Sequence, residues 1–177
     1  MTGWLYRVRQ FRQALNAKPS SGDMAEVRQA LPTTLYALFT RLQPSEKAHA
    51  IQVYRRVKTE SSDPDLLIAA LMHDIGKIMQ PLKTWERALI VLVQNSFLEK
   101  WLAPPAGEST DDRQRGWLRA LIVAEKHPVW GAQLVRKAGA SPVVVRLIRR
   151  HQDALSQPPE NREEELLRIL QTADNLS

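Results

Sequence analysis

The sequence predicts an all-α fold, and three observations lead to this prediction. Apolar residues recur at helical spacing through the long segments, and almost no segment shows the strict alternation of a half-buried strand. Proline or a capping residue precedes several of these segments, as is typical of helix starts. The 177 residues are 44% hydrophobic and 25% charged, which are ordinary values for one globular domain. We therefore expect a single helical domain over residues 1–177.

The N-terminal segment carries apolar residues at helical spacing, with arginines between them. The apolar positions are Trp4, Val8, Phe11 and Leu15. A basic helix at a membrane surface and a helix docked on a core both show this pattern. We favour a docked helix, because any helix packed on a domain has such a stripe, and expect an N-terminal helical extension over about residues 1–43.

The remaining helices are predicted from their start signals and from the breaks between them. The start signals are, in chain order, Pro32, Ser45, Asp63 with Pro64, and Ser141 with Pro142. Two stretches lack apolar periodicity and are rich in proline and polar residues. We expect Ala103–Asp112 to form a surface loop and Ser156–Asn161 to separate the last two helices.

Composition excludes several classes of protein and site. Cysteine is absent, which excludes a disulfide framework, a thiolate zinc site and a cysteine nucleophile. The N-terminal segment has too many arginines for a signal peptide, and no stretch approaches the roughly 20 apolar residues of a membrane span. We expect a cytoplasmic protein without a membrane partner.

The formal net charge of +6 is compatible with an anionic partner, because basic surfaces attract phosphates. The arginines are scattered over several segments, however, as they are on solvated helix faces. Charge therefore allows a nucleotide or nucleic acid partner without favouring one. The sequence gives no indication of the oligomeric state.

The segment around HDIGK places a carboxylate on an apolar helix face. Leu67, Ala70, Leu71 and Asp74 follow one another at helical spacing. An ionised carboxylate buried without a partner is too costly to expect. Asp74 is therefore predicted to be paired, protonated or bound to a cation.

The same pattern recurs in other helices. Apolar stripes also contain His49, His127, His151 and Asp174. A single histidine on such a face is more often a hydrogen-bonded core residue than a ligand. Here all four histidines of the chain, His73 included, lie at such positions together with two aspartates. Imidazoles and carboxylates without thiolates suit Mn, Fe, Co, Ni, Zn or, with more oxygen ligands, Mg.

The order of these residues resembles a known family. His49, then His73 and Asp74 within MHDIGK, and finally Asp174 in TADNLS are similar to the motif of the HD superfamily of metal-dependent phosphohydrolases. His127 and His151 resemble the two additional histidines of its binuclear branch. That branch includes HD-GYP phosphodiesterases and HD-type diadenosine tetraphosphate hydrolases.

The resemblance implies a compact helical bundle and a set of metal ligands. The HD core would span about residues 44–177, with an insertion over about residues 80–115. One metal would be held by His49, His73, Asp74 and Asp174. Asp74 would bridge to a second divalent metal held by His127 and His151. The GYP signature is absent, since Pro128 follows His127, which argues against cyclic di-GMP as substrate.

A mechanism follows from this resemblance as a hypothesis. Two metals would activate a water for in-line attack on phosphorus, with Asp74 as the bridging catalytic ligand. Lys77 would neutralise charge on a phosphoryl oxygen. Lys126 and Arg150 flank ligand histidines and would line an anion-binding cleft. The expected substrate is a nucleotide or another small phosphoester.

Two alternatives remain at the sequence level. The same six ligands also suit a mixed-valent di-iron oxygenase. The second alternative is a non-catalytic regulatory module that binds nucleotides or RNA through its basic surface. The complete ligand set favours an enzyme over this module.

Overall fold

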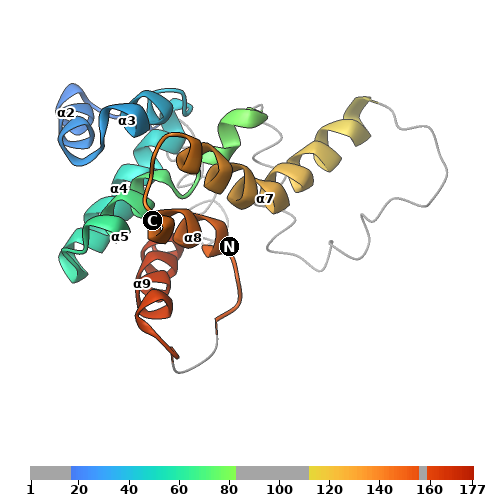
Figure 1. Cartoon of the computed structure of the whole chain (residues 1–177). Helices are drawn as coiled ribbons and strands as arrows, with labels where there is room; N and C mark the ends of the chain where they lie inside the picture. The colour runs from blue at the N-terminus through green and yellow to red at the C-terminus, as the bar shows by residue number, and fades with distance from the viewer. Residues whose placement is uncertain (1–16, 83–111, 156–158) are drawn as a thin grey trace, which may run out of the picture.

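The computed structural model describes residues 17–82, 112–155 and 159–177, and these residues form only helices, turns and loops (Figure 1). The elements are α2 (Ser21–Ala30), α3 (Thr33–Phe39), α4 (Pro44–Glu60), α5 (Pro64–Met72), the 3-10 helix η1 (Ile75–Met79), α7 (Asp112–Lys137), α8 (Pro142–Arg150) and α9 (Arg162–Asn175). The predicted all-α fold is confirmed. The predicted helix within residues 1–16 lies outside the described residues, as do most of the expected insertion and of the loop before Asp112.

Most of the predicted helix starts are confirmed. Capping side chains and prolines explain why the helices begin at these residues. Asp63 accepts hydrogen bonds from the backbone N–H groups of Asp65 and Leu66, and Ser141 accepts one from Val144. Proline occupies the first position of α5 and of α8, where its missing N–H costs nothing.

The start at Ser45 was wrong by two residues. α4 begins at Pro44, with Gln43 as its N-cap. The carboxylate of Glu46 accepts a hydrogen bond from the Gln43 N–H at 2.9 Å, which satisfies a backbone group at the helix entrance. Sequence reasoning also gave no start for α2, which Ser20 and Asp23 cap reciprocally.

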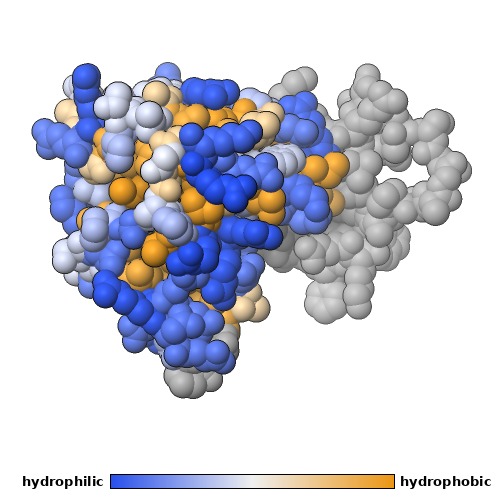
Figure 2. Space-filling view, in the orientation of Figure 1, coloured by the Kyte–Doolittle hydropathy of each residue, from blue (hydrophilic) through white to orange (hydrophobic). Residues whose placement is uncertain are grey.

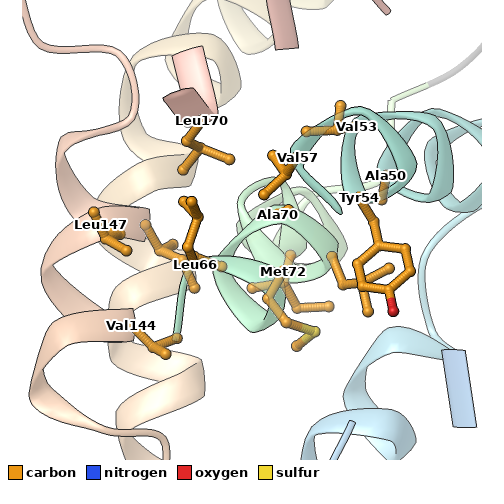
Figure 3. Close-up of a cluster of buried hydrophobic side chains, with 14 of the residues drawn as sticks. Ala50, Val53, Tyr54, Val57, Leu66, Ala70, Met72, Val144, Leu147 and Leu170 are labelled. Carbon is orange, nitrogen blue, oxygen red and sulfur yellow. The ribbon is translucent and has the colours of Figure 1, made fainter. Parts of the chain in front are cut away.

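The core lies around α5, the most enclosed helix of the bundle. Figure 3 shows apolar side chains of α4, α8 and α9 meeting those of α5, among them Val57, Leu66, Leu147 and Leu170. These four side chains are fully buried. α7 packs instead against η1 and α8, on the other side of the bundle.

Polar contacts align α5, α8 and α9 at their N-terminal ends. Ser141 donates to Asp65 at 2.8 Å, which joins the start of α8 to the start of α5. Arg162 donates to Asp63 at 2.7 Å, which joins the start of α9 to the same place. The three helices then run in one direction, because their C-terminal ends also meet, as described below.

The cap at Asp63 gives a first stability prediction. Asp63→Ala removes the α5 cap and the pair with Arg162, and we expect it to lower the free energy of unfolding by about 1–2 kcal/mol. Urea denaturation measures this change. The control Arg162→Ala removes only a pair with a largely exposed arginine and should cost less than ~1 kcal/mol. Equal effects of the two substitutions would contradict the role of the cap.

The face of the protein in Figure 2 carries both hydrophobic and hydrophilic residues. Figure 2 shows hydrophobic residues scattered between hydrophilic ones on this face. Among the described residues, no helix combines the length and the apolar content that a membrane crossing needs.

Candidate metal centre

The structure brings all six predicted ligands together. Their side chains come from α4, from the α5–η1 junction, from α7, and from the C-terminal ends of α8 and α9. They form two groups of three, each able to hold a metal ion, with ligand atoms within 4.8 Å of one another in each group. The first group is His49, His73 and Asp174, and the second is Asp74, His127 and His151.

The first group is centred on one oxygen of Asp174. The Oδ1 atom of Asp174 lies 2.8 Å from Nε2 of His49 and 3.5 Å from Nε2 of His73. His73 is buried, whereas His49 and Asp174 are partly exposed. The group therefore reaches from the core to the surface of the protein.

The second group is wholly buried and is centred on Asp74. Nε2 of His127 lies 3.2 Å from Oδ1 of Asp74 and 3.2 Å from Nε2 of His151. The other oxygen of Asp74, Oδ2, faces His73 of the first group at 3.6 Å. The two carboxylate oxygens of Asp74 thus face one group each.

Each of the three buried histidines is oriented by a hydrogen bond between its Nδ1 atom and a backbone carbonyl of the preceding helical turn. Nδ1 of His73 lies 2.9 Å from the carbonyl of Ala70, and Nδ1 of His151 lies 2.8 Å from that of Ile148. In α7, His127 uses the carbonyl of Val123 at 2.9 Å. A carbonyl only accepts hydrogen bonds, so each Nδ1 carries a proton and each neutral ring presents a lone pair at Nε2. This is the arrangement in which histidines bind metals.

In the neutral rings, the Nε2 atoms require a proton or a cation as partner. Nε2 of His73 is fully buried and has no hydrogen-bond partner among the described residues. Nε2 of His127 and of His151 lie close enough that two lone pairs would repel each other unless a proton or a cation lies between them. Divalent cations held by the two groups would satisfy all three atoms, and these residues therefore fit a metal centre.

The helix ends add to this preference for cations. His73 and His151 immediately follow the last residues of α5 and α8, and Asp174 lies in the last turn of α9. The C-terminal end of a helix carries partial negative charge on its unpaired carbonyls. Three such ends converge on the centre, where they favour positive charge.

Electrostatics divides the buried ligands into charged and neutral ones. Burial lowers the pKa of His73, but the carboxylates of Asp74 and Asp174 outweigh this effect and raise it to about 9. Burial and the neighbouring charge of His73 lower the pKa of His151 to about 4. Burial raises the pKa of Asp74, but the charges of Lys77 and His73 outweigh burial and hold it well below its usual range. At neutral pH His151 is therefore ready to bind a metal, while His73 must first lose a proton.

This proton gives a pH prediction. In protein stripped of metal by chelation, the raised pKa of His73 contributes stability below pH 6.5 that is lost as the pH rises through 9. Metal binding needs neutral His73, so its stabilising effect should grow over the same range. We expect the Tm of chelated protein to fall between pH 7 and 9.5, and the Tm gain on adding Mn²⁺ to rise. His73→Gln should weaken both trends, and a Mn²⁺ effect that is independent of pH would contradict this assignment.

The three predicted substrate-binding residues differ in their distance from the metal centre and in their partners. Lys77 lies in the centre and donates to Oδ2 of Asp74 at 2.6 Å. Lys126 is exposed and donates to Glu125 at 2.8 Å. The guanidinium of Arg150 pairs with three carboxylates, those of Asp153, Glu163 and Glu164, at 3.3–3.5 Å. Of these three residues, Lys77 is therefore the one that contacts a candidate ligand.

Two features of the centre differ from the sequence analysis or were missed by it. No helix bounds were predicted around His127, which lies within α7, directly before the internal Pro128. Gly76, to which no role was given, lies against the carbonyl of His127 so closely that a Cβ atom would come within 1.9 Å of that oxygen. Gly76 in HDIGK and Gly131 of α7, which lies at the same contact, are the glycines that mark this close approach in the sequence.

A comparison with protein families decides the assignment. A family model described as the HD domain matches residues 45–177. The chain belongs to the HD domain family. Members of this family are generally metal-dependent phosphohydrolases, and the two ligand groups described above lie within the matched residues. No curated protein and no solved structure matches the chain.

Proposed function

We propose that this HD domain protein is a phosphohydrolase that uses two divalent metals and acts on a nucleotide or another small phosphoester. The position of Asp74 supports this proposal most directly. Its two oxygens face His73 of one ligand group and His127 of the other. A carboxylate in this position is suited to be shared by two cations, whereas a site for one cation would need only one of the groups.

The chemistry divides between the metals and the chain. When bound, a pair of divalent metals supplies Lewis acidity and activates a water for attack on phosphorus. The chain contributes ligand orientation through the Nδ1 contacts of the buried histidines. Lys77 contributes a partly exposed ammonium beside Asp74, where it would neutralise charge on a phosphoryl oxygen.

The donor set limits the choice of metal. Four imidazoles and two carboxylates without thiolates suit Mn, Fe, Co, Ni or Zn, and Mg if water completes the coordination. Lys126 and Arg150 are not needed in this proposal, because their charges are already paired with carboxylates.

The proposal is tested by counting metals in two matched variants. We expect untagged protein to bind about two Mn²⁺ per chain, measured by mass spectrometry of the metal content after dialysis. His49→Gln removes a ligand of the first group, and His127→Gln removes one of the second. Each variant should keep about one metal and lose hydrolysis of aryl phosphates and nucleotides. One metal in the unmodified protein, lost in both variants alike, would contradict the two-metal proposal.

Oxygen dependence separates this proposal from the oxygenase alternative. A phosphohydrolase releases phosphate equally in air and under argon. Turnover that requires oxygen and iron, without phosphate release with any metal, would establish oxygenase chemistry instead. Salt-sensitive RNA binding without turnover would indicate the regulatory module.

A further inference from the structure

A polar pocket adjoins the metal centre. It has a volume of about 430 Å³ and lies between the turn after α8 and the C-terminal turns of α9. Its lining residues are His151, Gln152, Asp153, Gln171, Asp174 and Asn175. Because His151 belongs to one ligand group and Asp174 to the other, a molecule in the pocket lies next to both groups.

The lining determines which part of a substrate fits. No lysine, arginine or apolar residue is among the described residues that line the pocket. A phosphate therefore finds no cationic side chain there, and an apolar group finds no apolar wall. Amides and a carboxylate recognise neutral groups with several hydrogen-bond donors and acceptors, such as hydroxyls.

Two polar side chains of the pocket, those of Asp153 and Gln171, form hydrogen bonds within the protein, and the exposed amides of Gln152 and Asn175 form none within the part of the chain that the structure describes. Gln171 donates to the backbone carbonyl of Asp153 at 2.8 Å, which ties α9 to the turn after α8. Arg150 donates to Oδ2 of Asp153 at 3.3 Å, and no described residue donates to Oδ1. The amides of Gln152 and Asn175 form no hydrogen bond with the described residues. One carboxylate oxygen and two amides remain for a ligand.

We propose that this pocket binds the ribose of a ribonucleotide, with Asp153 accepting hydrogen bonds from the sugar hydroxyls and Gln152 and Asn175 completing the contacts. This inference rests on the proposed phosphohydrolase function and adds the substrate class. A carboxylate that accepts from the 2′-hydroxyl is an established way of recognising ribose. Arg150 is then a positioning residue that orients Asp153, in place of the phosphate-binding role expected from its charge.

The size of the pocket is compatible with a nucleoside. Pockets of about 300–1,000 Å³ hold ligands of drug size, and this pocket is at the lower end of that range. With the phosphate at the metals, the remaining volume suits a single nucleoside. The pocket is therefore large enough for the nucleoside of a mononucleotide.

The test compares three substrates with Mn²⁺ present: a ribonucleoside 5′-monophosphate, its 2′-deoxy analogue and p-nitrophenyl phosphate, which has no sugar. We expect kcat/KM to be about tenfold higher for the ribonucleotide than for the deoxynucleotide. Asp153→Ala and the double variant Gln152→Ala with Asn175→Ala should reduce the ratio of nucleotide to aryl phosphate kcat/KM about tenfold. In Asp153→Ala the preference for ribose should disappear. The matched control is Gln52→Ala, an exposed amide on α4.

A binding measurement makes the result independent of turnover. Saturation-transfer NMR with adenosine and 2′-deoxyadenosine on chelated protein should give a stronger signal for adenosine, which Asp153→Ala removes. Equal kcat/KM ratios in the parent protein and the pocket variants, with aryl phosphate hydrolysed, would overturn the ribose pocket and leave the phosphohydrolase intact. Absence of hydrolysis of all three substrates would instead count against the proposed function, and a ribose-selective NMR signal would still support the pocket.

Discussion

Asp74→Ala is expected to abolish hydrolysis, with a loss in kcat/KM of at least ~10³-fold, or about 4 kcal/mol of transition-state stabilisation. The reason is that this one carboxylate contacts His73, His127 and Lys77 and faces both ligand groups. Removing it should therefore reduce metal binding at both groups, unlike a histidine substitution in only one of them. The measurements are metal content after dialysis and phosphate release with Mn²⁺.

A second substitution separates catalysis from folding. Asp74→Ala also leaves the positive charges of His73 and Lys77 without their nearest carboxylate, which destabilises the fold. Asp74→Asn keeps the size of the side chain and should keep the helical circular dichroism while losing both metals. Glu60→Gln, an exposed carboxylate at the end of α4, is the matched control and should behave like the parent. A folded Asp74→Asn protein with full metal content and activity would overturn the central role of Asp74.

Gly76→Ala is expected to produce the largest loss of stability, about 3 kcal/mol or more. A Cβ atom at this position would lie 1.9 Å from the carbonyl oxygen of His127 and 2.7 Å from the amide nitrogen of Gly131. Both are backbone atoms of α7, which cannot move aside as a flexible side chain can. η1 and α7 would have to separate, and this would pull His127 away from Asp74. Urea denaturation and Mn²⁺ titration should therefore both report a loss.

Gly22→Ala is the matched control for this prediction. The nearest atom to its Cβ would be Oγ of Ser20, at an ordinary contact distance of 3.7 Å. Because Gly22 lies within α2, alanine there should be neutral or stabilising by up to ~1 kcal/mol. If the two substitutions had the same effect, the close approach of η1 and α7 would not be the cause.

The helices were predictable because their signals are local. Asp63 with Pro64 and Ser141 with Pro142 act on backbone groups within three residues, and the structure confirms both starts. The error at Ser45 was also local, since Gln43 is not among the common N-cap residues and its role depends on Glu46. α2 was missed although Ser20 and Asp23 have the spacing of a capping box.

The candidate ligands were recognisable because polar residues on apolar stripes are rare. His73, His127 and His151 are each almost fully buried, as their positions on apolar faces predicted. The motif HDIGK and the family match then agree on the same region of the chain. The charged residues beside the ligands were harder to place, since Arg150 pairs with Glu163 and Glu164 of α9, which are distant from it in sequence.

The sequence by itself determined the helical class, the membership of the HD family and the identity of the six candidate ligands, because periodicity, caps and the order of motifs can all be read along the chain. Tertiary structure alone decided the distances within and between the two ligand groups, that Gly76 lies on the backbone of α7, and that a polar pocket adjoins the centre. His49 and Asp174 are 125 residues apart in sequence and 2.8 Å apart in space. Such a distance is fixed by the packing of whole helices, and no local pattern encodes it.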